Sequence, residues 1–172
     1  MAAEQVILVD ERDRPVGAME KLAAHRHGGV RHRAFSVFIL DPRGRWLLQK
    51  RAAGKYHFPG LWTNACCSHP RPGEDTAAAA HRRLREELGF DCPLTERFQF
   101  EYKADSAAEG LTEHELDHVF TGIHDGPVRP DPAEVGATRW VAPADLAREL
   151  QAHPEVFTPW FKLACDRVRA LG

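Results

Sequence analysis

Two short segments of the chain carry side chains that bind metals and transfer protons. Residues 64–70, Asn-Ala-Cys-Cys-Ser-His-Pro, place Cys67 two positions before His69, and further along Glu113 stands two positions before Glu115. Side chains two positions apart on an extended strand point to the same face. Cys67 and His69 can therefore share one surface, and Glu113 and Glu115 can share another. If these surfaces meet, one pocket holds a thiol, imidazoles and carboxylates.

Two further histidines, His25 and His32, lie upstream of these segments. A pocket with that set of groups is a metal site with a reactive thiol beside it. Cys66 is the natural comparison for Cys67, because its odd offset turns it to the opposite face of the same strand. We interpret the histidines without such a neighbourhood as surface residues. They are His27, His57, His81 and His153.

The composition limits what such a pocket can serve. The 172 residues suffice for one domain with a real core, so we take residues 1–172 as a single domain. The hydrophobic share of 43% and the charged share of 28% are typical of globular proteins. A net charge of −2 gives no electrostatic case for nucleic acid or a membrane surface.

No apolar run approaches the roughly 20 residues that a membrane helix needs. The N-terminus lacks a signal-peptide pattern, and the four cysteines show no disulfide pattern. We therefore expect a cytoplasmic protein that acts on a small molecule, as a monomer or a weak homodimer.

Hydrophobic and turn patterns predict a mixture of strands and helices without a strict β-α-β rhythm. This mixture favours an α/β fold with a mixed sheet over a doubly wound parallel sheet. The clearest helix spans 75–88, and Gly89 ends it. The expected extended segments are 6–9, 34–40, 46–50, 61–68, 98–103, 116–123 and 138–141, and the expected helices are 20–24, 75–88, 143–150 and 160–171.

The segment 68–90 around that helix resembles the Nudix box, G-x5-E-x7-R-E-U-x-E-E-x-G-U, where U is a bulky apolar residue. The matching residues are Glu74, Arg82, Leu84, Glu86, Glu87, Gly89 and Phe90. Two positions differ, because Ser68 replaces the first glycine and Arg83 replaces the glutamate after the arginine. The second change removes a hard oxygen ligand and adds a cation. We expect a site altered in this way to bind a diphosphate rather than hydrolyse it.

The segment 64–70, the altered Nudix box, Glu113-His114-Glu115 and Phe157-Thr158-Pro159-Trp160 occur together in one order. This combination resembles the type 1 isopentenyl-diphosphate delta-isomerases of the Nudix superfamily, from about residue 6 to the last helix. The resemblance implies a mixed β-sheet sandwiched between helices. It also implies an isomerase of isoprenoid biosynthesis that interconverts isopentenyl and dimethylallyl diphosphate.

In that family a proton is added at one carbon and another is removed two carbons away, through a tertiary carbocation. The resemblance assigns the two proton transfers to Cys67 and Glu115, and places Tyr102 beside Glu115. Which group gives the proton depends on the direction of the reaction and stays open here. Trp160 is expected to put its π-face against the cation, in a pocket that excludes water.

The resemblance also implies two metal ions. The first is held by three histidines and two glutamates, which map to His25, His32, His69, Glu113 and Glu115. These ligand types suit Mn²⁺, Zn²⁺ or Fe²⁺ and do not choose among them. The second is Mg²⁺, which links Glu87 to the diphosphate of the substrate. Four cationic residues are then expected to bind that diphosphate, namely Lys21, Arg51, Lys55 and Arg83.

Two other functions stay open at the level of the sequence. The first is a true Nudix hydrolase, which Glu86 and Glu87 favour and Arg83 opposes. Metal-dependent phosphate release from nucleotides would identify it. The second is a non-enzymatic metal-binding or ligand-binding module, because a fold does not dictate a function. In that case a Cys67→Ala variant would change no activity.

Overall fold

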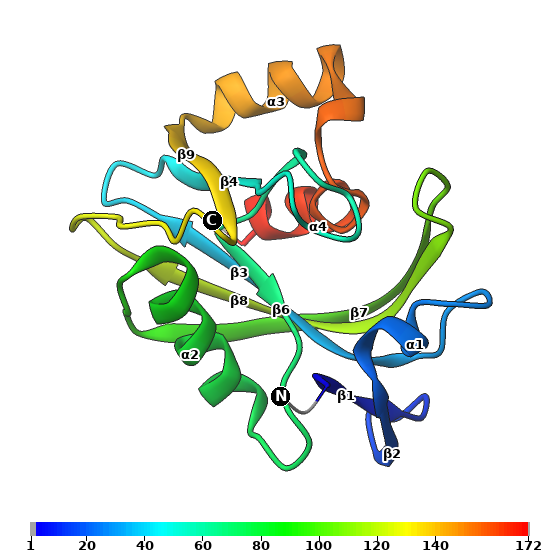
Figure 1. Cartoon of the computed structure of the whole chain (residues 1–172). Coiled ribbons are helices and arrows are strands. Elements are labelled where there is room, and N and C mark those ends of the chain that lie inside the picture. The colour runs from blue at the N-terminus through cyan, green and yellow to red at the C-terminus, as the bar shows by residue number, and fades with distance from the viewer. Residues whose placement is uncertain (1–2, 172) are drawn as a thin grey trace.

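Two parallel strands lie at the centre of the sheet in this computed structural model, which describes residues 3–171 (Figure 1). They are β3 (His32–Leu40) and β8 (Leu111–Ile123). Their register runs from His32 opposite Glu115 to Leu40 opposite Ile123. Residues from distant parts of the chain therefore stand side by side at the start of β3.

The remaining strands extend the sheet on both sides of this pair. The other strands are β1 (Gln5–Val9), β2 (Pro15–Glu20), β4 (Trp46–Arg51), β5 (Trp62–Thr63), β6 (Cys66–Ser68), β7 (Leu94–Ser106) and β9 (Val135–Val141). β3 also pairs antiparallel with β1, β4 and β6. Of these three, β1 pairs further with β2, and β4 pairs further with β5 and β9. The long β7–β8 hairpin forms the other border and curls away from the centre (Figure 1).

Helices cover both faces of the sheet, with α2 on one face and α4 on the other (Figure 1). The helices are α1 (Lys21–Ala24), α2 (Thr76–Leu88), α3 (Pro143–Ala152) and α4 (Pro159–Arg169), with a short 3₁₀ turn at Pro154–Val156. This arrangement confirms the predicted mixed sheet between helices. In the described part of the chain, none of the helices is long and apolar enough to cross a membrane.

Strand β3 is buried on both faces and so supplies both halves of the core. Phe35 and Val37 pack with Leu84 of α2 in one hydrophobic cluster. Phe38, on the opposite face of the strand from these two residues, packs with Phe161 of α4 in the other cluster. A strand that is covered on both faces has a continuous apolar sequence. Such a sequence made this strand predictable.

Helix α2 begins one residue after the predicted start at 75 and ends at the predicted residue, Leu88. The Asp75 side chain accepts a hydrogen bond of 3.0 Å from the Ala78 amide, which caps the first turn. Gly89 ends the helix in the left-handed conformation, with φ of 70°. Both caps fix the position of the carboxylates in the last turn of the helix.

The strands differ from prediction mainly in length. β7 and β8 are each 13 residues long, well beyond the expected segments 98–103 and 116–123. β2 was not expected, because most of its residues are exposed and show no apolar alternation. The extended segment 61–68 is interrupted, so that β5 pairs with β4 and β6 pairs with β3. β4 makes its longest pairing with β9 rather than with its hairpin partner β3.

Candidate active site and metal centre

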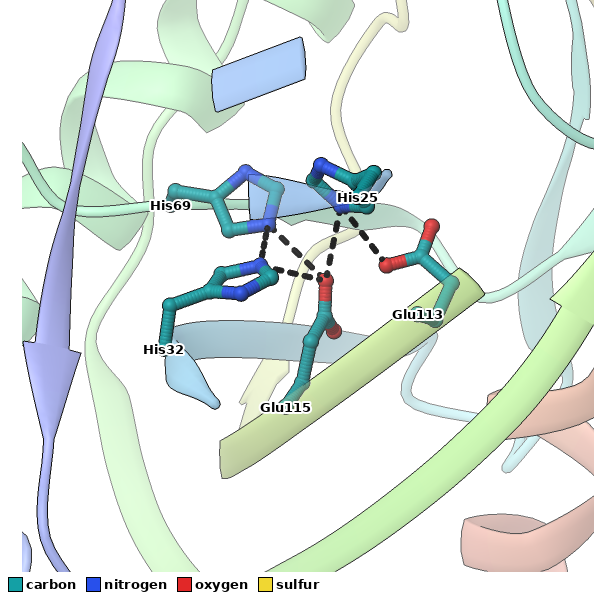
Figure 2. A group of neighbouring side chains, drawn as sticks. All are labelled: His25, His32, His69, Glu113 and Glu115. Atoms are coloured by element: carbon teal, nitrogen blue, oxygen red, sulfur yellow. Dashed lines mark hydrogen bonds and ion pairs between the residues drawn. The ribbon is translucent and has the colours of Figure 1, made fainter. Parts of the chain in front are cut away.

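Five buried ligand-type side chains converge beside the start of β3 and β8 (Figure 2). Their ligand atoms all lie within 4.8 Å of one another, and the residues are His25, His32, His69, Glu113 and Glu115. The histidines follow α1, begin β3 and follow β6, whereas both glutamates stand on one face of β8. The two surfaces predicted from the spacing of two therefore meet.

Backbone carbonyls orient two of the imidazoles toward the centre of this cluster. Nδ1 of His25 lies 2.6 Å from the Lys21 carbonyl, and Nδ1 of His32 lies 2.7 Å from the Val30 carbonyl. A carbonyl can only accept, so each Nδ1 carries a proton. In the neutral ring, Nε2 then offers a lone pair, as a metal ligand requires.

The free electron pairs in the cluster point at one another. Nε2 of His32 and Nε2 of His69 are 3.2 Å apart, and Nε2 of His69 is 2.8 Å from a Glu115 oxygen. Lone pairs and carboxylates crowded in this way need a cation among them, so the set of donors fits a bound metal ion.

Burial and neighbouring charges shift the pKa values of these groups in different directions. Burial lowers the pKa of His25, but the hydrogen bonds to Glu113 and Glu115 outweigh it and raise that pKa to about 10. Burial, with the Glu115 charge beside it, raises the pKa of Glu113 to about 7. Burial also lowers the pKa of His69 to about 3. A proton on His25 can be displaced by a metal cation that serves both carboxylates.

Tyr102 lies directly opposite Glu115 in the β7–β8 register. Its hydroxyl donates a hydrogen bond of 2.6 Å to the Glu115 oxygen that faces away from His69. Burial raises the pKa of the Tyr102 hydroxyl well above its usual range, so that it stays a donor. Glu115 is thereby held on both carboxylate oxygens.

The two adjacent cysteines face opposite sides of the sheet, as predicted. Cys66 is fully buried in the cluster under α2, whereas Cys67 lines the cleft on the other face. Cys67 pairs with Ser36 of β3, and its Sγ lies 3.8 Å from the Asn64 side-chain oxygen. Burial raises the pKa of the Cys67 thiol to about 12, so the resting group is a protonated thiol.

One cleft joins the thiol, the metal-ligand cluster and the predicted binding residues. Cys67, His69, Tyr102, Glu113 and Glu115 all line it. So do all five residues predicted to contact the substrate, namely Lys21, Arg51, Lys55, Arg83 and Trp160. The Arg51 guanidinium stands 5.4 Å from the centre of the Trp160 ring. A cleft with cations at its wall and an aromatic ring beside a thiol suits an anion attached to an apolar group.

Glu87 lies behind the cleft wall rather than in the five-residue cluster. It is 2% exposed, and Arg83 and Gln49 hold its two oxygens at 2.5 and 3.0 Å. Arg83 also pairs with Glu134 at 3.2 Å, and Lys55 pairs with the same carboxylate. The altered Nudix position thus supplies a guanidinium between Glu87 and the cleft.

The prediction that His57 lies at the surface was wrong. Its side chain is 6% exposed, lines the cleft, and contacts a Glu113 oxygen through Nε2. Burial, aided by the Arg51 charge, lowers the pKa of His57 to about 2. No spacing rule marks this residue, because it lies on the loop between β4 and β5. The neighbouring Tyr56 also lines the cleft and was equally missed.

The other unassigned histidines fit the prediction in part. His27 and His153 are exposed. His81 is half-buried, where Nδ1 pairs with an Asp91 oxygen at 2.6 Å.

Comparison with known proteins shows which family the chain belongs to. Residues 30–161 match the NUDIX domain model. The chain is 50% identical over 165 residues to isopentenyl-diphosphate Delta-isomerase 2 of Aromatoleum aromaticum, across 96% of this chain and 86% of that protein. It is 54% identical to the isopentenyl-diphosphate Delta-isomerase of Nocardia farcinica, across 90% of this chain and 89% of that protein.

Solved structures share the fold at much lower identity. A Deinococcus radiodurans protein superposes with a TM-score of 0.78 at 21% identity, over 95% of this chain and 98% of that one. A MutT protein of Methanosarcina mazei gives 0.65 at 19% identity, over 80% and 91%. These two structures share the fold alone, whereas the relatives named above are isomerases. This chain belongs to the isopentenyl-diphosphate delta-isomerase family.

Proposed function

We propose that the protein interconverts isopentenyl diphosphate and dimethylallyl diphosphate by moving protons through a tertiary carbocation. The observation that carries this proposal is the cleft that joins the Cys67 thiol to the Glu115–Tyr102 pair. A double-bond shift needs one group that gives a proton and one that takes a proton. A protonated thiol and an ionised carboxylate in one cleft supply such a pair.

The two groups stand on strands that flank β3 from either side. Cys67 belongs to β6, and Glu115 belongs to β8. A five-carbon chain between them can receive a proton on one side and lose one on the other. We propose that the roles of the two groups exchange when the reaction runs in reverse, as microscopic reversibility requires.

Trp160 and Tyr102 are proposed to protect and position the reacting groups. The Trp160 side chain is 3% exposed, and its ring faces the same cleft as Cys67. Its π-face can attract a carbocation by about 2 kcal/mol in a desolvated site. Its bulk also keeps water away from a cation that water would quench. The Tyr102 hydroxyl fixes the direction in which Glu115 presents its oxygen.

The diphosphate is proposed to bind the cations in the cleft wall. Arg51 and Arg83 offer forked donors, and Lys21 and Lys55 offer point charges. Lys55 and Arg83 are paired with Glu134 in the free protein. A diphosphate can take the place of this single carboxylate with more charge and more acceptor oxygens.

The five-residue cluster is proposed to hold one Mn²⁺ or Zn²⁺ ion, and Glu87 is proposed to share Mg²⁺ with the diphosphate. Support for the first ion comes from the converging donor atoms of the cluster. To bind Mg²⁺, Glu87 would exchange its hydrogen bonds to Arg83 and Gln49 for the cation. When bound, the first ion fixes Glu115 and tunes its acidity, and the second neutralises phosphate charge. His69→Ala should lose the tightly held ion, which elemental analysis of the purified variant measures. Full occupancy in this variant would remove His69 from the ligand set.

Two properties of the whole protein belong to the same proposal. A monomer or a weak homodimer suffices, because one chain supplies every residue described in the cleft. A cytoplasmic location suits the chemistry, because a reducing compartment keeps Cys67 a free thiol.

The experiment that tests the activity incubates the purified protein with isopentenyl diphosphate and Mg²⁺ and follows the organic product and free phosphate together. We expect dimethylallyl diphosphate to form with no phosphate release. The Cys67→Ala variant should form none. Rapid phosphate release, from this substrate or from nucleotides, would support a hydrolase instead.

A further inference from the structure

The His57 ring stands against the metal-ligand cluster without belonging to it. Its Nε2 contacts Oε1 of Glu113, while the other Glu113 oxygen, Oε2, lies 3.0 Å from Nε2 of His25. The two carboxylate oxygens therefore have separate neighbours. One faces the centre of the cluster, and the other faces His57.

The His57–Glu113 contact joins a ring nitrogen to a carboxylate oxygen. A carboxylate that binds a cation is ionised and can only accept, so with a metal bound the proton between the two atoms would belong to Nε2 of His57. A nitrogen of Arg51 also approaches this Nε2, but at 3.5 Å it is too long to compete. The described residues offer no partner to Nδ1 of His57.

The surroundings hold the His57 ring in one orientation. Its ring stacks on His25, with centroids 5.3 Å apart and planes inclined by 25°. Its backbone carbonyl accepts a hydrogen bond of 3.1 Å from Arg51. The side chain is 6% exposed, so water has little access to the contact with Glu113. A donor held this firmly can fix the rotation of the Glu113 carboxylate.

We infer that His57 is a positioning residue of the metal centre, which holds Oε1 of Glu113 so that Oε2 alone is presented to the cation. This inference rests on the proposed metal binding by the five-residue cluster. Groups that orient a metal ligand from behind typically change metal affinity by about 10- to 100-fold when they are removed. His57 also lies next to Arg51, and so connects the metal centre to the proposed diphosphate site.

The test compares metal affinity in variants that keep or lose the donor. His57→Phe keeps a ring for packing on His25 but has no N–H group. His57→Ala loses both the ring and the N–H group. His57→Gln keeps an amide N–H group at a similar distance from the backbone. Competition with a chelator gives the dissociation constant for Mn²⁺ and for Zn²⁺, and circular dichroism confirms that each variant is folded. His153→Phe, at an exposed position, is the matched control.

We expect His57→Phe and His57→Ala to weaken metal binding by about 10- to 100-fold. The metal affinities of His57→Gln and His153→Phe should stay within about threefold of the parent's. His57→Gln retains an N–H donor, and His153 lies away from the metal centre. Unchanged affinity in both donor-free variants would overturn the inference, and so would a His57→Gln variant as weak as His57→Phe. A parent protein that binds neither metal would instead contradict the metal centre itself.

Discussion

At the scale of single residues, the site depends on which face of a strand each side chain occupies. Cys67 and Cys66 are neighbours in sequence, yet one lines the cleft and the other is buried under α2. The spacing of two predicted this division, and it predicted the joint surface of Glu113 and Glu115. His57 could not be predicted in the same way, because loop burial arises from tertiary packing and leaves no periodic signal.

The first prediction concerns the thiol. Cys67→Ser should keep the fold and lose about 10²- to 10⁴-fold in turnover, because a hydroxyl transfers protons far less readily than a thiol. Steady-state rates with isopentenyl diphosphate measure the loss. Cys66→Ala is the control, since it alters the adjacent thiol on the opposite face of the same strand. A Cys67→Ser variant with nearly normal turnover would show that Cys67 does not transfer the proton.

At the scale of elements, the helix with the altered Nudix box is the best-predicted part of the molecule. Its cap at Asp75 and its end at Gly89 follow local rules, so the sequence alone located it. The strands were harder to predict from the sequence. The ends of β7 and β8 and all of β2 are held by pairing with distant strands, which local patterns do not reveal. The break between β5 and β6 likewise depends on two different partner strands.

The second prediction concerns the end of α2. Gly89→Ala should lower the free energy of unfolding by about 1–3 kcal/mol. The residue has φ of 70°, and an added Cβ would lie 2.8 Å from the Arg129 carbonyl oxygen. Gly54→Ala is the control, because an added Cβ there meets no atom within 4 Å. Urea unfolding measures both variants, and equal stabilities would contradict the strain at position 89.

The third prediction concerns the ion pair that joins the start of the Nudix-like segment to α2. Glu74 accepts two hydrogen bonds from Arg82, at 2.7 and 2.8 Å, and hydrogen bonding to Arg82 is the main cause that lowers the Glu74 pKa below its usual 4.5. A carboxylate with a lowered pKa in the folded state stabilises the protein above pH 4.5. This contribution is lost as the pH falls through the folded-state pKa.

Glu74→Gln imitates the protonated acid at every pH. It should therefore destabilise the protein at pH 7, by about 1 kcal/mol. The difference from the parent should shrink steadily below pH 4.5, as the parent also becomes protonated. Unfolding curves at several pH values provide the measurement. A difference that stays constant down to acid pH would contradict an ionic origin.

At the scale of the whole molecule, the sheet brings together residues that lie far apart in the chain. The parallel pairing of β3 with β8 sets His32 against Glu115, and the pairing of β3 with β6 brings Cys67 and His69 to the same side. The sequence indicated these residues through their types and their family pattern. Their mutual distances followed only from the pairing of β3 with β8, about 80 residues further along the chain, and with β6, about 30 residues further along.

The fourth prediction concerns removal of the metal. Without a cation, the two buried carboxylates and three imidazoles have only protons to balance their charges. A ligand present at 100 times its dissociation constant stabilises a protein by about 2.7 kcal/mol, so a chelator should lower the melting temperature by about 5–10 °C. Thermal unfolding with and without chelator measures this shift, and added Mn²⁺ or Zn²⁺ should reverse it. His69→Ala should show little response, and a parent protein indifferent to the chelator would contradict a metal at this cluster.

The cleft is proposed to move a double bond by adding one proton and removing another. Proton NMR of the protein with isopentenyl diphosphate and Mg²⁺ in D₂O tests this proposal most directly. We predict that dimethylallyl diphosphate appears and carries deuterium taken from the solvent through Cys67 and Glu115. Substrate that stays unchanged while the metal sites are filled, or product without deuterium, would contradict the account.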